Sequence, residues 1–142
     1  MYNYGKLEQL VLSCILLKPE LIEDERLEDK YFISSKRIWS FMKAFYKKFG
    51  NFDFETMCLA ASNKYKIMMY ITELIQLEPT PSRFEEYLNL MIELYNEEKK
   101  EQWLRNKVYD LATEFYLKTI DLKTFNDSLN RLYKNCEEIF KK

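Results

Sequence analysis

The scarcity of glycine and proline is the feature that most limits what this chain can fold into. Glycine occurs only at Gly5 and Gly50, and proline only at Pro19, Pro79 and Pro81, in a chain of 142 residues. Tight turns between strands depend on such residues, whereas helix interiors exclude them. Between these breakpoints, apolar residues recur every three or four positions, which is the helical period. The sequence therefore predicts an all-α fold.

The apolar stretch LEQLVLSCILLKPELI, at residues 7–22, predicts the first core helix. Its apolar positions follow the spacing of one helix face: Leu7, Leu10, Val11, Cys14 and Ile15. Only Lys6 supplies a positive charge ahead of it, and no small-residue cleavage site follows, as a secretory signal would require. The run from Leu10 to Leu17 is also far shorter than the roughly 20 residues that cross a bilayer. We therefore interpret the stretch as part of a globular domain.

Polar residues at fixed positions predict where the next helices begin and end. A helix should begin at Ser34 or Ser35, either of which could cap it, and end at Gly50 in a left-handed conformation. Asp53 should cap a helix over residues 54–63, followed by another over about 66–77. The segment Ser82-Arg83-Phe84-Glu85 has the spacing of a capping box, in which the serine and the glutamate satisfy each other's free backbone groups.

Two C-terminal segments carry narrow apolar seams that predict an antiparallel helical hairpin. The first seam comprises Leu104, Val108, Leu111 and Phe115, and the second comprises Leu122, Phe125, Leu129, Leu132, Cys136 and Ile139. The short break KTID separates them, with Asp121 as the expected cap of the second helix. We predict a single domain over residues 1–142, with a globular helical bundle at 1–96 and the hairpin at 97–142.

A second aromatic series lies outside the predicted seams, at Trp103, Tyr109, Tyr116, Tyr133 and Phe140. A two-helix hairpin cannot bury two apolar stripes on each helix. Either the hairpin folds back on the N-terminal helices, or the second stripe contacts another chain; we favour the second, because exposed aromatic patches usually mark contacts. The predicted oligomer interface comprises Trp103, Tyr109, Ala112, Tyr116, Leu117, Leu129, Tyr133 and Phe140.

The composition offers no catalytic, cofactor-binding or metal-binding constellation. Histidine is absent, and no glycine-rich phosphate-binding loop occurs. The cysteines at positions 14, 58 and 136 are odd in number and widely spaced, which argues against a disulfide framework or a zinc site and favours the cytoplasm. The net charge is −1, and Lys and Arg show no concentration on one face. We therefore expect DNA contact only indirectly, no membrane association and no enzymatic activity.

Ordered signatures along the chain provide a resemblance. They are Glu8-Gln9 with Lys18–Ile22, Tyr31-Phe32 with Lys36–Trp39, Tyr46–Thr56, Tyr70–Leu74 with Pro79–Tyr87, and Leu129–Phe140. In this order they resemble the N-terminal domain of DnaB-like replicative DNA helicases, with its L-D-P-E-L-I and H-R-x-I-F patterns. The resemblance covers essentially the whole chain and rests on helical signatures rather than on a catalytic motif.

Several positions depart from the family's pattern. Ser13 stands where the family usually has glycine, and Ser35 or Lys36 replaces its histidine. The Gly-Gly pair expected before Tyr70 is missing, and the arginine pair after the Tyr87 helix is not evident. Such divergence suggests a phage, plasmid or mobile-element relative, or a distant bacterial branch.

The resemblance implies a non-catalytic role in DNA replication. In that family the ATPase motor lies in a separate C-terminal domain, and N-terminal domains pair through their hairpins into a trimer-of-dimers collar on the hexamer. The collar also contacts primase and the helicase loader. We expect this chain to be either such a domain of a longer helicase, which is the simpler case, or a stand-alone accessory protein that docks on one.

A small helical transcriptional or inhibitor-type binding module is the alternative from another class. It would need a basic recognition helix to bind DNA, and the apparent dispersal of the Lys and Arg residues counts against it. An enzyme ranks last, because no cluster of perturbed titratable groups is visible in the sequence.

Overall fold

The computed structural model describes residues 3–61 and 65–141, and within these ranges it is built from helices without strands. The α-helices are α1 (Tyr4–Leu17), α2 (Lys36–Phe49), α3 (Phe54–Ala60), α4 (Tyr65–Gln76), α5 (Phe84–Tyr116) and α6 (Leu122–Ile139). Three short 3-10 helices connect them: η1 (Pro19–Glu23), η2 (Asp29–Tyr31) and η3 (Pro81–Arg83). The predicted all-α class is confirmed.

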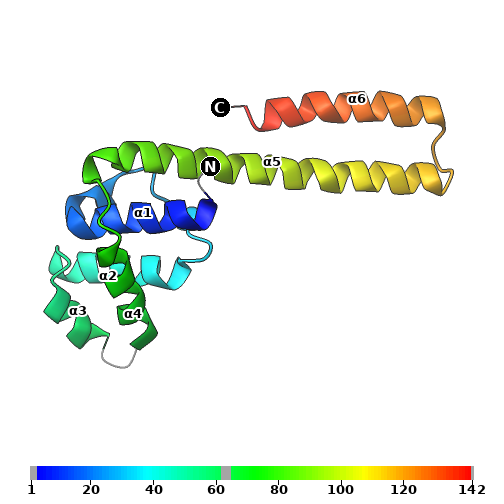
Figure 1. Cartoon of the computed structure of the whole chain (residues 1–142). Helices are drawn as coiled ribbons and strands as arrows, with labels where there is room; N and C mark the ends of the chain where they lie inside the picture. The colour runs from blue at the N-terminus through cyan, green and yellow to red at the C-terminus, as the bar shows by residue number, and fades with distance from the viewer. Residues whose placement is uncertain (1–2, 62–64, 142) are drawn as a thin grey trace. The chain divides into compact units, whose positions relative to one another are not determined.

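The chain divides into two compact units, Met1–Ile92 and Glu93–Lys142, and the division falls within α5. The first unit holds α1 to α4 and the start of α5, whereas the second holds the rest of α5 and α6 (Figure 1).

Helix α1 forms the centre of the first unit and packs against α4, η1 and η3. Four residues of its predicted face, Leu7, Val11, Cys14 and Ile15, are fully buried, whereas Leu10 is half-buried. Burial extends beyond that face, because Leu12, Ser13 and Glu8 are also inaccessible. The Ser13 hydroxyl donates to the Leu74 carbonyl of α4 at 2.7 Å, so the serine that replaces the family's glycine has a buried acceptor.

The N-terminus of α2 is capped from a distance, and the predicted serine cap is wrong. Ser35 occupies the N-cap position, but its side chain makes no capping bond; its hydroxyl lies 2.8 Å from that of Tyr70. The buried Glu8 carboxylate of α1 instead accepts from the Ser35 backbone N–H at 3.2 Å and the Ser34 hydroxyl at 2.7 Å. A carboxylate at a helix N-terminus also interacts favourably with the positive end of the helix dipole.

Two of the predicted helix-end devices in the first unit are confirmed. Gly50 ends α2 with a φ of 71°, and Asp53 caps α3 by accepting from the Thr56 backbone N–H at 3.0 Å. These bonds to Thr56 hold the pKa of the Asp53 carboxyl below its usual value. The last residues of the helix predicted over 54–63 lie outside the described residues.

The predicted capping box is wrong. Ser82 lies inside η3, and α5 begins at Phe84. The Glu85 carboxylate instead pairs with Arg26 through contacts of 2.5 and 2.6 Å, and Arg26 also contacts Asp24 at 2.7 Å. The arginine lowers the pKa of both carboxyl groups. This bidentate contact ties the segment after η1 to the start of α5.

The buried face of α2 differs from the predicted one at two residues. Ile38, Met42 and Phe45 are buried as expected, but Phe49 is exposed. Trp39, which lies outside the predicted face, is buried; its ring stacks on Phe32 at 4.3 Å, and its indole N–H donates to Asp29 at 2.7 Å.

Candidate interaction surface

The second unit is an antiparallel hairpin of two helices (Figure 1). Near the turn, the rings of Phe115 and Phe125 contact each other with centroids 5.0 Å apart. Farther from it, Lys100 of α5 pairs with Glu137 of α6 at 3.0 Å. As the position moves back along α5 from residue 115 to residue 100, its partner moves forward along α6 from residue 125 to residue 137. The two helices are therefore antiparallel, which confirms the predicted hairpin.

The turn is stabilised by short-range hydrogen bonds. Lys118 adopts a left-handed conformation with a φ of 63°, and the backbone N–H of Thr119 donates to the Glu114 carbonyl at 3.0 Å. This is a Schellman ending, although glycine is the usual residue at the left-handed position. Asp121 then caps α6 by accepting from the Thr124 backbone N–H at 2.8 Å, as predicted, and the bonds to Thr124 lower the pKa of the Asp121 carboxyl.

The seam of the hairpin is only partly covered. Cys136 is its one buried residue among those described, and Leu104, Val108 and Leu111 are half-buried. Leu122 and Ile139, which were predicted to lie in the seam, are 60% and 58% exposed. The two helices therefore leave the ends of the predicted seam uncovered.

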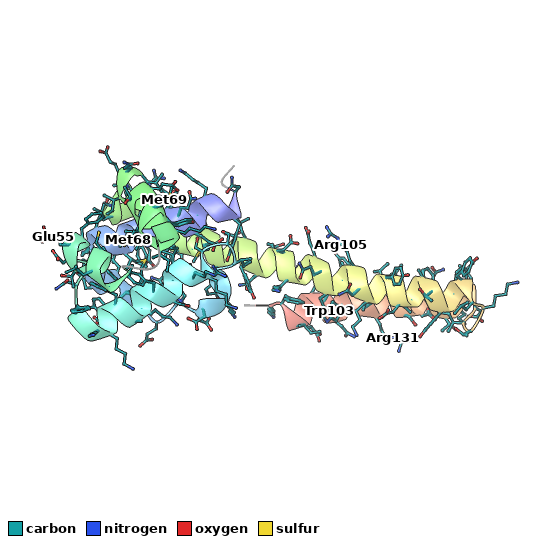
Figure 2. The ribbon with its side chains drawn as sticks, turned by 90° about the horizontal axis from the view of Figure 1, so that it is seen from below. Glu55, Met68, Met69, Trp103, Arg105 and Arg131 are labelled. Carbon is teal, nitrogen blue, oxygen red and sulfur yellow. The ribbon has the colours of Figure 1, made fainter. Side chains whose placement is uncertain are left out.

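The second aromatic series divides into two groups. Tyr109, Tyr116 and Tyr133 are 73%, 83% and 63% exposed. Trp103 and Phe140 are half-buried, and their rings meet edge to face across the hairpin with centroids 6.1 Å apart. In Figure 2, Trp103 lies where α5 and α6 come together. Because their rings contact each other within the hairpin, these two residues are less accessible than the three tyrosines, and their place in the interface stays a prediction.

The exposed residues on α5 form one stripe. Tyr109, Ala112 and Tyr116 are spaced i, i+3 and i+7, and all three are exposed. Arg105 lies one turn earlier on the same stripe, and Figure 2 shows it pointing away from α6. Leu117, which follows α5 directly, is 63% exposed. Apart from Trp103, the predicted interface residues of α5 and the following Leu117 are therefore accessible in the single chain.

The apolar residues of α6 in the predicted interface differ from one another in exposure. Leu129 is half-buried, and Tyr133, four residues later, is exposed. Leu122 lies seven residues before Leu129 and belongs to the same stripe, although the sequence prediction assigned it to the seam alone. Its i, i+7, i+11 relation to Leu129 and Tyr133 was the signal that could have identified it.

An open hollow of about 1130 Å³ lies beside the hairpin turn. Its lining includes Ala112, Phe115, Tyr116 and Ile120, with Lys118 and Asp121 as its charged residues. We define the hairpin surface as the exposed residues Tyr109, Ala112, Tyr116, Leu117, Leu122 and Tyr133. Its chemistry suits apolar and aromatic contact rather than a reaction.

The described residues contain no arrangement suited to metal chemistry or to a reactive thiol. No group of acidic or cysteine side chains there could hold a metal ion. Burial raises the pKa of the Cys14 thiol to about 11, so at neutral pH it stays protonated and unreactive. None of the helices described is long and apolar enough to span a bilayer.

Comparison with known protein families matches residues 2–93 to the family described as DnaB-like helicase N terminal domain. The match covers most of the first unit and ends at the start of the second. Searches of curated proteins and of solved structures found no match.

Proposed function

The chain belongs to the family of DnaB-like helicase N-terminal domains, the non-catalytic region linked to helicase oligomerisation, and from this we propose that its hairpin surface pairs with the same surface of a second copy. The observation that carries the proposal is the exposure of Tyr109, Tyr116 and Tyr133 in a hairpin that buries almost none of its own side chains. Aromatic residues that stay accessible in a stripe are typical of protein contacts.

Pairing of identical surfaces is the simplest geometry that would cover both stripes. In a two-fold dimer, the residues of one patch contact the same patch of the partner, so one hairpin surface suffices for closure. Two hairpins together would form a four-helix arrangement, in which the half-buried seam residues Leu129 and Leu111 gain the layer that a two-helix hairpin lacks. This would also bury Leu122.

The resemblance to the family suggests a larger assembly, which we propose here. Three such dimers would form a collar on a hexameric replicative helicase, whose ATP-dependent motor would lie in a separate domain. Primase and the helicase loader are the partners we expect the collar to contact, in the cytoplasm. The departures at Ser13 and before Tyr70 leave the residues that contact these partners unassigned.

The test is the oligomeric state of a variant that lacks the exposed rings on α5. Tyr109→Ala with Tyr116→Ala removes two side chains that are 73% and 83% exposed, so we expect unchanged helicity. Sedimentation velocity over a range of concentrations should show a dimer for the natural chain and a monomer for the variant, because the truncation removes two aromatic contacts per copy.

A matched control removes two exposed aromatic rings from the first unit. Phe49→Ala with Phe54→Ala changes side chains that are 41% and 44% exposed, and we expect it to leave self-association intact. A natural chain that is monomeric at all concentrations would refute the proposal. So would a dimer that persists unchanged in the Tyr109 and Tyr116 variant.

A further inference from the structure

The charged residues of helix α2 are all cations, and they lie on one side of the helix. Its sequence, KRIWSFMKAFYKKF, contains five cations and no acidic residue. Lys36, Lys43 and Lys47 are spaced i, i+7 and i+11, and Arg37 and Lys48, each one residue later, are spaced i and i+11. At about 100° per residue, all five fall within one sector of the helix. The expectation that Lys and Arg gather on no single face is therefore wrong for α2.

The opposite side of the same helix is buried, so the cations face outward. Ile38, Trp39, Met42 and Phe45 point into the first unit. Lys36, Arg37, Lys47 and Lys48 are exposed, and within the described part of the chain none of them forms an ion pair. Lys43 is the exception, because it contacts Asp29 at 2.5 Å. We call Lys36, Arg37, Lys47 and Lys48 the cationic face.

The placement of two of these cations does not favour helix stability. Lys36 and Arg37 occupy the first turn of α2, where the positive end of the helix dipole disfavours cations. The buried Glu8 carboxylate offsets this repulsion at the same helix end. Lys36 also interacts electrostatically with Asp29, but neither Lys36 nor Arg37 forms an ion pair among the described residues, so both keep their charged groups available to a ligand outside the chain.

An aromatic hollow borders the cationic face. It has a volume of about 490 Å³, and its lining includes Phe41, Lys48, Phe49 and Leu59. The Lys48 ammonium lies 5.4 Å from the centroid of the Phe49 ring, and that ring is 41% exposed. Cations next to accessible aromatic rings are the combination that binds single-stranded nucleic acid, since phosphates contact the cations and bases stack on the rings.

We propose that the cationic face of α2, with Phe49 beside it, binds single-stranded nucleic acid. From Lys36 to Lys47 the helix extends about 16 Å, enough to place its cations against several consecutive phosphates. The cations hold the backbone, and Phe49 offers a stacking surface at the end of the row. The contact is independent of sequence, because nothing in the face reads base edges. The site lies wholly in the first unit and is distinct from the hairpin surface.

Fluorescence anisotropy with a labelled oligothymidylate, at several salt concentrations, tests this directly. We expect weak binding at low salt, with a slope of log affinity against log salt of about −3 for four phosphate contacts. Arg37→Gln with Lys47→Gln and Lys48→Gln should weaken binding by about tenfold or more, because three of these contacts are lost. Glutamine has a helix propensity close to that of lysine and arginine, so α2 should remain folded.

The matched control is Lys6→Gln with Lys18→Gln and Lys66→Gln, which removes three exposed charges scattered over the same unit. It should retain most of the binding, and Phe49→Ala should reduce binding to the strand more than binding to a duplex of equal length. No binding by the natural chain at low salt overturns the proposal. Equal loss in both triple variants also overturns it, as does preferential binding of a poly-glutamate peptide, which would assign the face to an acidic protein segment.

Discussion

The two units of this chain differ in how many apolar side chains they bury. The first unit, Met1–Ile92, holds almost every buried apolar side chain among the described residues, and its central helix α1 is inaccessible on more than one face. Where the structure describes the second unit, Cys136 is its one buried residue, while Tyr116 and Leu122 stay more than half exposed. A segment that covers so little of its own apolar surface gains stability mainly from a partner. Under the proposed function, the first unit supplies the folded core and the second supplies the surface for association.

The helix ends show a parallel difference. In the first unit, the start of α2 is held by Glu8, a residue 27 positions away in the sequence from Ser35. In the second unit, the cap of α6 comes from Asp121 at the helix end itself, and the end of α5 is closed by Lys118 and Thr119. The first unit also uses a local cap at Asp53, but the long-range cap by Glu8 couples α1 to α2, whereas the local caps of the hairpin let its helices form with few tertiary contacts.

The largest expected effect contrasts one leucine from each unit. Leu12→Ala should lower the free energy of unfolding by about 3 kcal/mol, because a fully buried leucine leaves a cavity. Leu129→Ala, at a half-buried position of α6, should cost about 1 kcal/mol or less in dilute protein. Urea titration followed by circular dichroism measures both. Equal losses would mean that the hairpin has a core of its own.

The distant cap should produce the next largest effect. Glu8→Ala removes the acceptor of the Ser34 and Ser35 bonds and leaves the buried Ser35 backbone N–H without a partner, so we expect a loss of about 2 kcal/mol. Glu20→Ala, at an exposed position of η1, is the control and should have almost no effect. Thermal unfolding distinguishes the two, and a Glu8 variant as stable as the control would contradict the distant cap.

The Arg26 contacts should have a smaller effect that depends on pH. Arg26→Ala should cost about 1 kcal/mol at neutral pH, because the side chain is partly exposed and its contacts are screened. Arg26 lowers the folded-state pKa of Asp24 and Glu85, so its contribution is complete above the ordinary carboxyl pKa of about 4. It is lost as the pH falls through the lowered values. A difference between variant and natural chain that grows in acid would refute this assignment.

The smallest effect is expected at the hairpin turn, and it should be stabilising. Lys118 holds a φ of 63°, a conformation that costs a lysine more than a glycine. Lys118→Gly should therefore raise the stability of the second unit by about 0.5 kcal/mol. Hydrogen exchange of the α6 amides should slow slightly, and those of α1 should not change. Faster exchange in α6 would show that the left-handed turn is not maintained in solution.

The features that could be predicted from the sequence are those set by local chemistry. Helical spacing identified the hairpin, and the residue types at Gly50, Asp53 and Asp121 identified three helix ends. The two wrong helix caps both involve partners distant in sequence. Serines were the expected cap of α2, but Glu8 reaches it from another helix. Glu85 had the spacing for a capping box and is engaged by Arg26 instead.

The candidate surface shows the same limit. The exposure of Tyr109 and Tyr116 follows from their spacing relative to the α5 seam, and it could be predicted. The contact between Trp103 and Phe140 depends on the register of the two helices, which helical spacing alone does not fix. The cationic face of α2 was missed because the net charge of −1 averages it with acidic residues elsewhere in the chain; a helix-by-helix tally would have revealed it.

The central claim, that the hairpin completes its burial against a second copy, is tested most directly by hydrogen exchange at two protein concentrations. We expect the backbone amides of α6 and of the α5 segment after Ile92 to become more protected as concentration rises, because association stabilises them by mass action. The amides of α1 should be equally protected at both concentrations, because their burial is internal to the first unit. The lower concentration should be one at which sedimentation shows a monomer, and the higher one should lie above that range. Equal protection of the hairpin amides at the two concentrations would contradict the account.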